Sequence, residues 1–199
     1  MQKKIYNKAL VLLSGGQDWT TCLYWANKKF DKVYAIGFNY GQMHKDELKQ
    51  ARKIAKDINV NYKVLDLKNL MANSSLTTNG EHNKQSQYNN KLPASFTVGR
   101  NIIFLSIAGS YACSLGINDI ITGVCQTDYN GFPDCRKTSV DAMQNTLSLA
   151  YGCGDFRIHT PLMYIDKAQT WKMAKDLNCI DVIIKDTLTD YNGNKTLND

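Results

Sequence analysis

The sequence predicts an α/β fold in which helices cover a parallel β-sheet. Segments rich in β-branched and aromatic residues alternate with segments whose apolar residues recur every three or four positions, as in successive strand–helix–strand units. The first apolar segment, 10–13, carries no charge, which is typical of a strand covered on both faces. The length of 199 residues and the apolar share of 43% fit one domain with a sizeable core.

The first half of the chain shows the alternation most clearly. Asp18 and Thr20 offer capping oxygens where the first helix begins. In the second helix, Leu48, Ala51 and Ala55 share one face. The expected elements, in order, are a strand at 10–13, a helix at 21–29, a strand at 32–39, a helix at 43–58 and a strand at 61–66.

The second half continues the pattern after a polar stretch at 69–97. This stretch is too long for a plain connection, and it is either a lid over a substrate or a disordered solvent loop. The remaining elements are a buried helix at 101–115, a strand at 118–123, helices at 137–150 and 166–177, the latter capped by Asp166, and a short strand at 182–184. We expect one domain at 1–185 and a polar tail at 186–199.

Composition narrows the classes of function. The net charge of +6, from 24 basic and 18 acidic residues, suits an anionic ligand but is mild for direct nucleic-acid binding. The apolar runs are far shorter than a membrane span, and a polar start leads directly into the first strand, so we expect a cytoplasmic protein. The six cysteines are scattered without a CxxC pair, so we expect free thiols and no zinc site built from neighbouring residues.

The segment LVLLSGGQDWTTCL is the strongest indication of function. Ser14, Gly15 and Gly16 join the first strand to the first helix, and paired glycines allow successive N–H groups to point into one concavity. Such a loop before a helix N-terminus binds anions, most often phosphate. The segment lacks the Lys of a Walker A loop and the GxGxxG spacing, and the glycines alone are equally compatible with a simple tight turn.

Other candidate residues follow the ends of the expected strands, where open parallel sheets bind their ligands. In FNYGQMH, Tyr40 and Gln42 can form hydrogen bonds. In FTVGRN, Arg100 precedes the buried helix; a cation there is unfavourable unless it meets an anion or an acidic side chain. Lys167, in the first turn of its helix, either meets a polyphosphate or is solvated.

The stretch TGVCQTDYNGFPDCR is the second dense group of candidates. Asp128 and Asp134 can accept hydrogen bonds from a purine-like ring, and Phe132 can stack on its face. Asp side chains can also hold magnesium against a phosphate. Arg136 adds a positive charge at the end of the stretch. An ordinary Gly/Pro loop is the alternative for this stretch considered alone.

Together these segments resemble the 7-cyano-7-deazaguanine synthase family of queuosine biosynthesis, within the PP-loop ATP pyrophosphatase superfamily. The resemblance runs in family order from Leu13 to Gly193. The matching segments are LSGGQD, FNYGQMH, SSLTTN, FTVGRNIIFL, ITGVCQTDYNGFPDCR, TPLMYIDKAQTW and TLTDYNG.

The resemblance implies a Rossmann-like three-layer fold and a homodimer. It also implies an ATP- and Mg²⁺-dependent ligase that converts 7-carboxy-7-deazaguanine and ammonia to the nitrile through an acyl-adenylate and an amide. The implied catalytic residues are Asp18, Arg100 and Lys167. The implied nucleotide-binding residues are Leu13, Ser14, Gly15, Gly16, Gln17, Asp18, Trp19, Thr20 and Thr21. The expected substrate-binding residues are Tyr40, Gln42, Arg100, Asp128, Phe132, Asp134 and Arg136.

The chain departs from the family pattern at two places. Trp19 stands where the family has a serine beside the phosphate loop. Asp190 stands at the first of four family zinc cysteines, and the other three are missing, so we expect no zinc. These departures leave two alternatives open, an enzyme that stops at the amide and a binding protein with impaired catalysis. They also suggest a viral origin, in which case the location would be the host cytoplasm.

Overall fold

A computed structural model of the chain describes residues 6–42, 46–68, 96–127 and 132–187. Its centre is a five-stranded sheet in the order β3-β2-β1-β4-β5, and all four neighbouring pairs are parallel. The strands are β1 (Tyr6–Leu12), β2 (Phe30–Asn39), β3 (Asn61–Asp66), β4 (Asp119–Ile121) and β5 (Arg157–His159).

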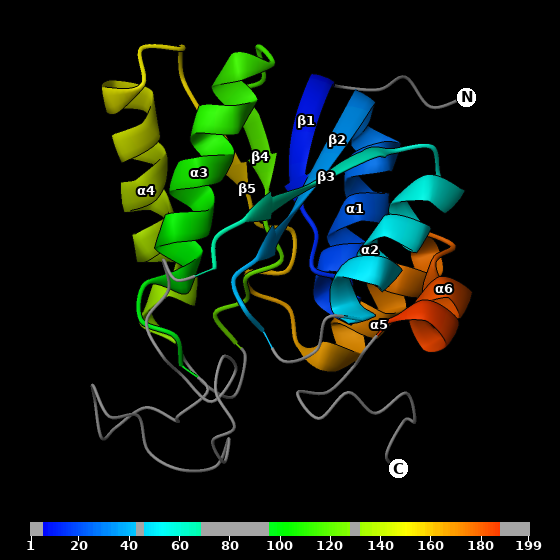
Figure 1. The fold of residues 1–199 in the computed structure, drawn as a ribbon. Coiled ribbons are helices and arrows are strands. Elements are labelled where there is room, and N and C mark those ends of the chain that lie inside the picture. The colour runs from blue at the N-terminus through cyan, green and yellow to red at the C-terminus, as the bar shows by residue number, and fades with distance from the viewer. Residues whose placement is uncertain (1–5, 43–45, 69–95, 128–131, 188–199) are drawn as a thin grey trace.

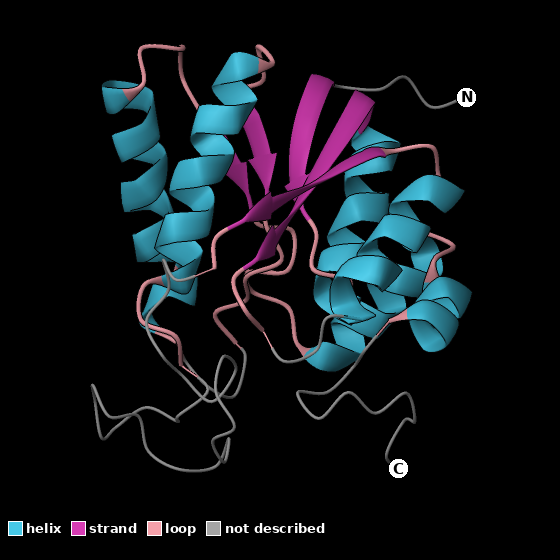
Figure 2. Ribbon diagram, viewed as in Figure 1, coloured by secondary structure: helices cyan, strands magenta, loops and turns pink. Residues whose placement is uncertain are grey.

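Helices cover both faces of the sheet, which gives three layers (Figures 1 and 2). One face carries α3 (Arg100–Ser114) and α4 (Lys137–Ala150), with the 3₁₀ turn η1 (Pro133–Cys135) between them in the chain. The other face carries α1 (Gln17–Lys29), α2 (Asp46–Asp57), α5 (Lys167–Asp176) and α6 (Ile180–Asp186). The predicted α/β class with a parallel sheet is confirmed.

The central strand β1 divides the core in two. Leu10 and Leu12 belong to a buried cluster with residues of α3 and α4. Val11 and Leu13 belong to a second cluster with residues of α1 and α2. Side chains alternate between the faces of a strand, so a strand covered on both faces is apolar throughout. This explains the charge-free run at 10–13.

The strand order places the loops that follow β1 and β4 next to each other, at the carboxyl ends of these two strands. β1 pairs with β2 on one side and with β4 on the other, and β1 and β4 are followed by helices on opposite faces of the sheet. In such a sheet the loops at the carboxyl ends of the two central strands separate and leave room for a ligand. The loop after β1 contains the predicted phosphate-binding residues.

Several predicted elements need correction. The expected strand at 182–184 is part of helix α6, whose Ile183 N–H donates to the Cys179 carbonyl at 3.0 Å; periodicity cannot classify such a short apolar run. The edge strand β5 was missed because it has only three residues, two of them charged or polar. Helix α1 begins at Gln17, so Asp18 and Thr20 lie inside it, and its N-cap is Gly16.

An ion cluster holds the edge strand β5 to β4. The carboxylate of Asp119 is buried and accepts from Arg157 Nε at 2.7 Å and Nη2 at 2.6 Å. His159 Nε2 lies 2.7 Å from the same carboxylate. Burial alone raises the pKa of Asp119, but the hydrogen bonds and charges of Arg157 and His159 outweigh it and bring that pKa below its ordinary value.

This cluster should make folding sensitive to acid. A lowered folded-state pKa contributes stability that is complete above the unfolded value of 3.8 and is lost as the pH falls through the folded value. We expect Asp119→Asn to lower the free energy of unfolding by about 2 kcal/mol at pH 7, because charge-assisted hydrogen bonds are lost. We also expect the stability of this variant to fall less steeply than that of the wild type as the pH is lowered. Urea unfolding from pH 7 to 3 measures both. Asp176→Asn, which removes an exposed pair with Lys172, is the control and should change neither.

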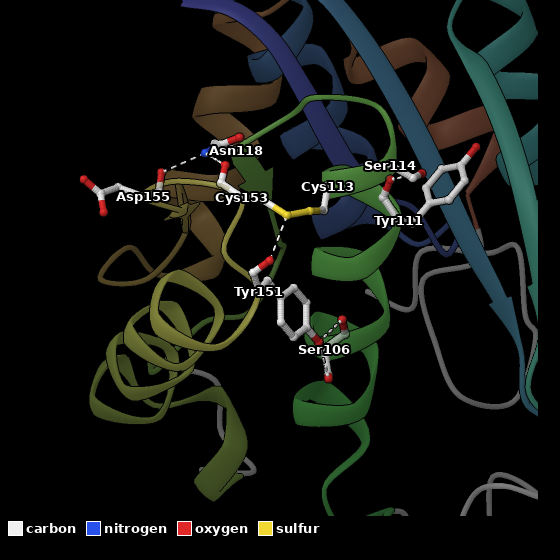
Figure 3. Close-up of a disulfide and its surroundings, with 8 residues drawn as sticks. All are labelled: Ser106, Tyr111, Cys113, Ser114, Asn118, Tyr151, Cys153 and Asp155. Atoms are coloured by element: carbon white, nitrogen blue, oxygen red, sulfur yellow. Dashed lines mark hydrogen bonds between the residues drawn. A yellow bond between two sulfur atoms is a disulfide. The ribbon is translucent and has the colours of Figure 1, made fainter.

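A disulfide links α3 to the segment that follows α4. Cys113 of α3 is bonded to Cys153, which follows α4 in the chain (Figure 3). Close by, the Tyr151 hydroxyl donates to the Ser106 carbonyl at 2.8 Å, and Asn118 Nδ2 donates to the Cys153 carbonyl at 2.9 Å. The expectation of free thiols was therefore wrong for this pair, because tertiary packing brings together cysteines 40 positions apart. Cys22, Cys125, Cys135 and Cys179 are free thiols.

Reduction of this bond should destabilise the fold. A cross-link across 40 positions removes chain entropy from the unfolded state, and we expect dithiothreitol to lower the free energy of unfolding by about 3–4 kcal/mol. Urea titrations with and without the reductant measure the change. The double variant Cys113→Ser, Cys153→Ser should have the free energy of unfolding of the reduced chain, and dithiothreitol should not change it. Equal stability of oxidised and reduced chains would contradict the prediction.

None of the helices within the described ranges is long and apolar enough to cross a membrane.

Candidate active site

The loop after β1 has the backbone shape that the paired glycines predicted. The Leu13 N–H extends the sheet by donating to the Ile36 carbonyl at 2.7 Å, and the Ser14 hydroxyl accepts from the Gly16 N–H at 3.3 Å. Gly15 has φ +95°, and a Cβ atom there would lie 2.4 Å from the Glu47 carbonyl oxygen of α2. Only glycine fits this turn, because both the backbone angle and the close approach of α2 exclude a side chain.

The N-terminus of α1 opens beside this loop. Its N-cap, Gly16, supplies no side-chain acceptor, and the Gly16 carbonyl accepts from the Thr20 N–H at 3.0 Å. The N–H groups of Gln17, Asp18 and Trp19 precede that first helical bond, so no helical carbonyl receives them. Together with the positive end of the helix dipole, these donors favour an anion at this point.

Buried polar atoms without partners gather at the ends of the two central strands. Within the described ranges, Gln17 Nε2, Asp18 Oδ1, Thr20 Oγ1 and Thr122 Oγ1 are buried and form no hydrogen bond. An unsatisfied buried polar group costs about 1–3 kcal/mol, so several at one strand edge indicate a place for a polar ligand. The Gln17 amide and the two threonine hydroxyls are donors that fit a polyphosphate, whereas Asp18 Oδ1 is an acceptor. Thr122 was missed from the sequence, although a polar residue directly after a buried strand could have signalled it.

The structure brings together two of the three predicted catalytic residues. Lys167 Nζ donates to Asp18 Oδ2 at 2.8 Å across 149 positions of sequence. Asp166 caps α5 through a hydrogen bond to the Gln169 N–H at 2.7 Å, and this cap fixes Lys167 as the first residue of the helix. The pair leaves the positive charge of Lys167 next to the first turn of α1, where a phosphate would lie.

The third predicted catalytic residue, Arg100, begins α3 on the opposite face of the sheet. Its N–H donates to the Thr97 carbonyl at 3.1 Å, and Gly99 before it has φ +68°. The buried carboxylate of Asp134 accepts at Oδ2 from the Asn101 N–H at 3.0 Å and from Asn101 Nδ2 at 3.1 Å. Asp134 thus fixes the start of the helix that carries Arg100, a contact that the sequence did not indicate.

The remaining predicted substrate residues lie around the ends of β2, α3 and α4. Gln42 is buried, accepts from the Tyr40 N–H at 3.0 Å and donates to the Phe38 carbonyl at 3.2 Å, so it fastens the turn after β2. The ring of Tyr40 lies 5.5 Å from that of Phe104. Phe132 is buried with its ring 5.3 Å from that of Phe96, and Arg136 is the exposed N-cap of α4. Asp128, most of the 69–97 stretch and most of the tail at 186–199 lie outside the described residues.

Trp19 lies inside the site region. Its indole is half-buried and packs against both halves of the core. A Cβ atom on Gly123, just after β4, would come within 3.2 Å of Trp19 Cδ2. The indole therefore occupies space between the loops that follow β1 and β4, and Gly123 is small enough to admit it.

The described ranges contain no group of three or more His, Cys, Asp or Glu side chains that could hold a metal ion. A divalent cation at this edge would therefore depend on oxygens of the ligand itself in addition to Asp18 Oδ1, a hard oxygen donor of the kind magnesium prefers. The predicted absence of zinc concerns the tail, which lies outside the described residues.

The fold is shared with solved structures of low sequence identity. The U34-tRNA thiolase NcsA from Methanococcus maripaludis is 16% identical, with a TM-score of 0.55 over 89% of this chain and 59% of that one. The NH3-dependent NAD synthetase from Campylobacter jejuni is 18% identical, with a TM-score of 0.54 over 89% of this chain and 67% of that one. These similarities show that the chain shares its three-layer α/β fold with these proteins, as the sequence predicted.

Comparison of sequences identifies the family, which comparison of folds does not. A relative from Clostridium botulinum (strain 657 / Type Ba4), named 7-cyano-7-deazaguanine synthase, is 48% identical over 190 residues, which are 94% of this chain and 86% of the relative. A sequence model of the family described as "Queuosine biosynthesis protein QueC" matches residues 8–198. The chain therefore belongs to the QueC family of queuosine biosynthesis proteins.

Proposed function

We propose that this chain is an ATP-dependent enzyme that converts 7-carboxy-7-deazaguanine and ammonia to 7-cyano-7-deazaguanine. The observation that carries the proposal is the 48% identity to a synthase of that name over 94% of the chain. The phosphate-type loop after β1 and the buried, unpartnered polar atoms beside it support nucleotide binding at this edge. The NAD synthetase that shares this fold is NH3-dependent, which supports ammonia as the nitrogen donor.

The proposed reaction uses two activations. The substrate carboxylate attacks the α-phosphate of ATP, pyrophosphate leaves, and ammonia displaces AMP to give the amide. A second ATP then activates the amide oxygen, and loss of that oxygen with AMP, together with two protons from nitrogen, gives the nitrile. Magnesium would neutralise phosphate charge in both activations.

The loop and its neighbours have defined tasks in this proposal. The N–H groups at the start of α1 bind the β- and γ-phosphates, which become the leaving pyrophosphate. Lys167 and Arg100 stabilise the negative charge that grows on it, and such preorganised charges contribute most where charge develops. Asp18 holds the Lys167 ammonium in place through the 2.8 Å ion pair.

We place the deazapurine beside α3, on the face of the sheet opposite to α2. The ring of Tyr40, half-buried beside Phe104 near the ends of β2 and α3, offers an apolar face for a bicyclic base. Gln42 and Asp134 already bond to backbone groups, so we assign them the shaping of this pocket. The residues proposed to line it are Tyr40, Gln42, Arg100, Asp128, Phe132, Asp134 and Arg136.

One incubation tests the proposal. The full chain is mixed with ATP, MgCl₂, ammonium chloride and 7-carboxy-7-deazaguanine, and the products are read by mass spectrometry. A nitrile establishes the proposed reaction and shows that the Trp19 indole is accommodated. An amide without nitrile supports the alternative of a single activation. If the substrate is unchanged but calorimetry shows that it binds, the proposed enzymatic activity is rejected and a binding protein is favoured.

The homodimer, the cytoplasmic location and the absence of zinc stay predictions. Size-exclusion chromatography with light scattering measures the first, and metal analysis of the purified full chain measures the last.

A further inference from the structure

A tyrosine from the third strand reaches across the sheet to the phosphate loop. Tyr62 lies on β3, and its hydroxyl donates to the Leu13 carbonyl at the end of β1, at 3.2 Å. Between them runs β2, which presents Gly37 at this level. A Cβ atom on Gly37 would collide with the Tyr62 hydroxyl and lie 3.0 Å from the Leu13 carbonyl oxygen. The side chain can cross only because this position of β2 is glycine.

This hydrogen bond acts on the last residue before the loop. The Leu13 N–H donates to the Ile36 carbonyl of β2 at 2.7 Å, so both backbone groups of Leu13 are fixed, one by the neighbouring strand and one by Tyr62. Two residues further on, Gly15 packs against the Glu47 carbonyl of α2. The direction in which the chain leaves the sheet is therefore set by contacts from β2, β3 and α2, and none of these uses the N–H groups that face the anion.

The Tyr62 hydroxyl is suited to a permanent donor role. Its side chain is half-buried, and this burial raises the pKa of Tyr62 above its ordinary value. The hydroxyl thus stays protonated throughout the physiological range and can always donate to the carbonyl.

We propose that Tyr62 is a positioning residue for the phosphate loop, whose hydroxyl holds the Leu13 carbonyl so that the N–H groups of residues 17–19 keep an ATP-binding arrangement. The identity of the ligand rests on the proposed function, whereas the effect on the loop does not. Tyr62 touches no reacting atom and acts through the backbone.

The test compares two variants that each remove one tyrosine hydroxyl from a backbone carbonyl. Tyr62→Phe removes the bond to Leu13. Tyr151→Phe removes the bond to Ser106 in α3 (Figure 3), away from the loop, and serves as the matched control. Amide hydrogen exchange of the ligand-free chains, read for peptides covering 14–19, reports on the loop, and calorimetry with ATP and MgCl₂ reports on binding.

In Tyr62→Phe we expect loop exchange to accelerate at least about fivefold and the Kd for ATP to rise about tenfold, the equivalent of one hydrogen bond of about 1.4 kcal/mol. The kcat at saturating ATP should stay within about twofold, since binding energy common to ground and transition states changes KM alone. Tyr151→Phe should change neither loop exchange nor Kd. Gly37→Ala, which displaces the tyrosine, should reproduce the faster exchange.

Unchanged loop exchange in Tyr62→Phe, or equal acceleration in Tyr151→Phe, would overturn the positioning role. Faster loop exchange in Tyr62→Phe alone, in a chain whose wild type binds no ATP, would support the positioning role and reject the proposed function. The two ideas therefore fail in different measurements.

Discussion

Replacing Lys167 by Ala should lower kcat about 100- to 1000-fold, the cost of removing one preorganised charge that acts on the transition state. The ammonium lies 2.8 Å from Asp18 Oδ2, beside the first turn of α1, where the leaving pyrophosphate would gain charge. The fold should tolerate the change, because the Lys167 side chain is 58% exposed and an exposed ion pair contributes about 0–1 kcal/mol. Pyrophosphate release at saturating ATP, ammonia and carboxylate measures kcat.

The neighbouring lysine of the same helix offers a matched control. Lys172 lies in α5 and pairs with Asp176 on the exposed side, so Lys172→Ala removes the same charge from the same helix without touching the loop. Its kcat should stay within about twofold of the wild type. Lys167→Arg keeps the charge but has a planar head that fits a different geometry, and we expect an intermediate loss. Equal kcat values in Lys167→Ala and Lys172→Ala would remove Lys167 from the mechanism.

The sequence predicted the architecture because its signals are local. The strand at 61–66 and the helix at 137–150 have the predicted bounds, and both follow from periodic apolar residues with clear turn residues around them. The loop at 14–16 was also recognisable, since paired glycines directly after a buried strand are typical of a tight turn with unusual backbone angles. The parallel order of the sheet follows from the alternation of strands and helices.

What the sequence could not predict depends on partners far away in the chain. The strand β5 is held by the Arg157–Asp119 ion pair, and three residues carry no period of their own. The disulfide can join Cys113 to Cys153 because α3 packs beside the segment that follows α4. At the site, polar residues at strand ends could be selected as candidates. That Asp134 binds the start of α3 required the folded structure.

The second large effect is expected at Gly15, where two separate costs coincide. A side chain at φ +95° is strained, and its Cβ atom would lie 2.4 Å from the Glu47 carbonyl oxygen, a backbone atom that a rotamer change cannot move. We expect Gly15→Ala to lose about 2–4 kcal/mol of unfolding free energy, from left-handed strain of about 1–2 kcal/mol plus overpacking of about 1–3 kcal/mol. Urea unfolding measures this loss.

ATP binding should also suffer in Gly15→Ala, because α2 and the loop must separate to admit the methyl group, and the N–H groups of residues 17–19 then move relative to the loop. We expect no ATP binding by calorimetry up to about 100 times the wild-type Kd, equal to about 2.7 kcal/mol. Gly152→Ala separates the two costs. Gly152 also has positive φ, +62°, but nothing lies within 4 Å of its Cβ position. That variant should show strain of about 1–2 kcal/mol with wild-type ATP affinity. A Gly15→Ala chain that binds ATP as tightly as Gly152→Ala would show that the loop after β1 does not hold the phosphates.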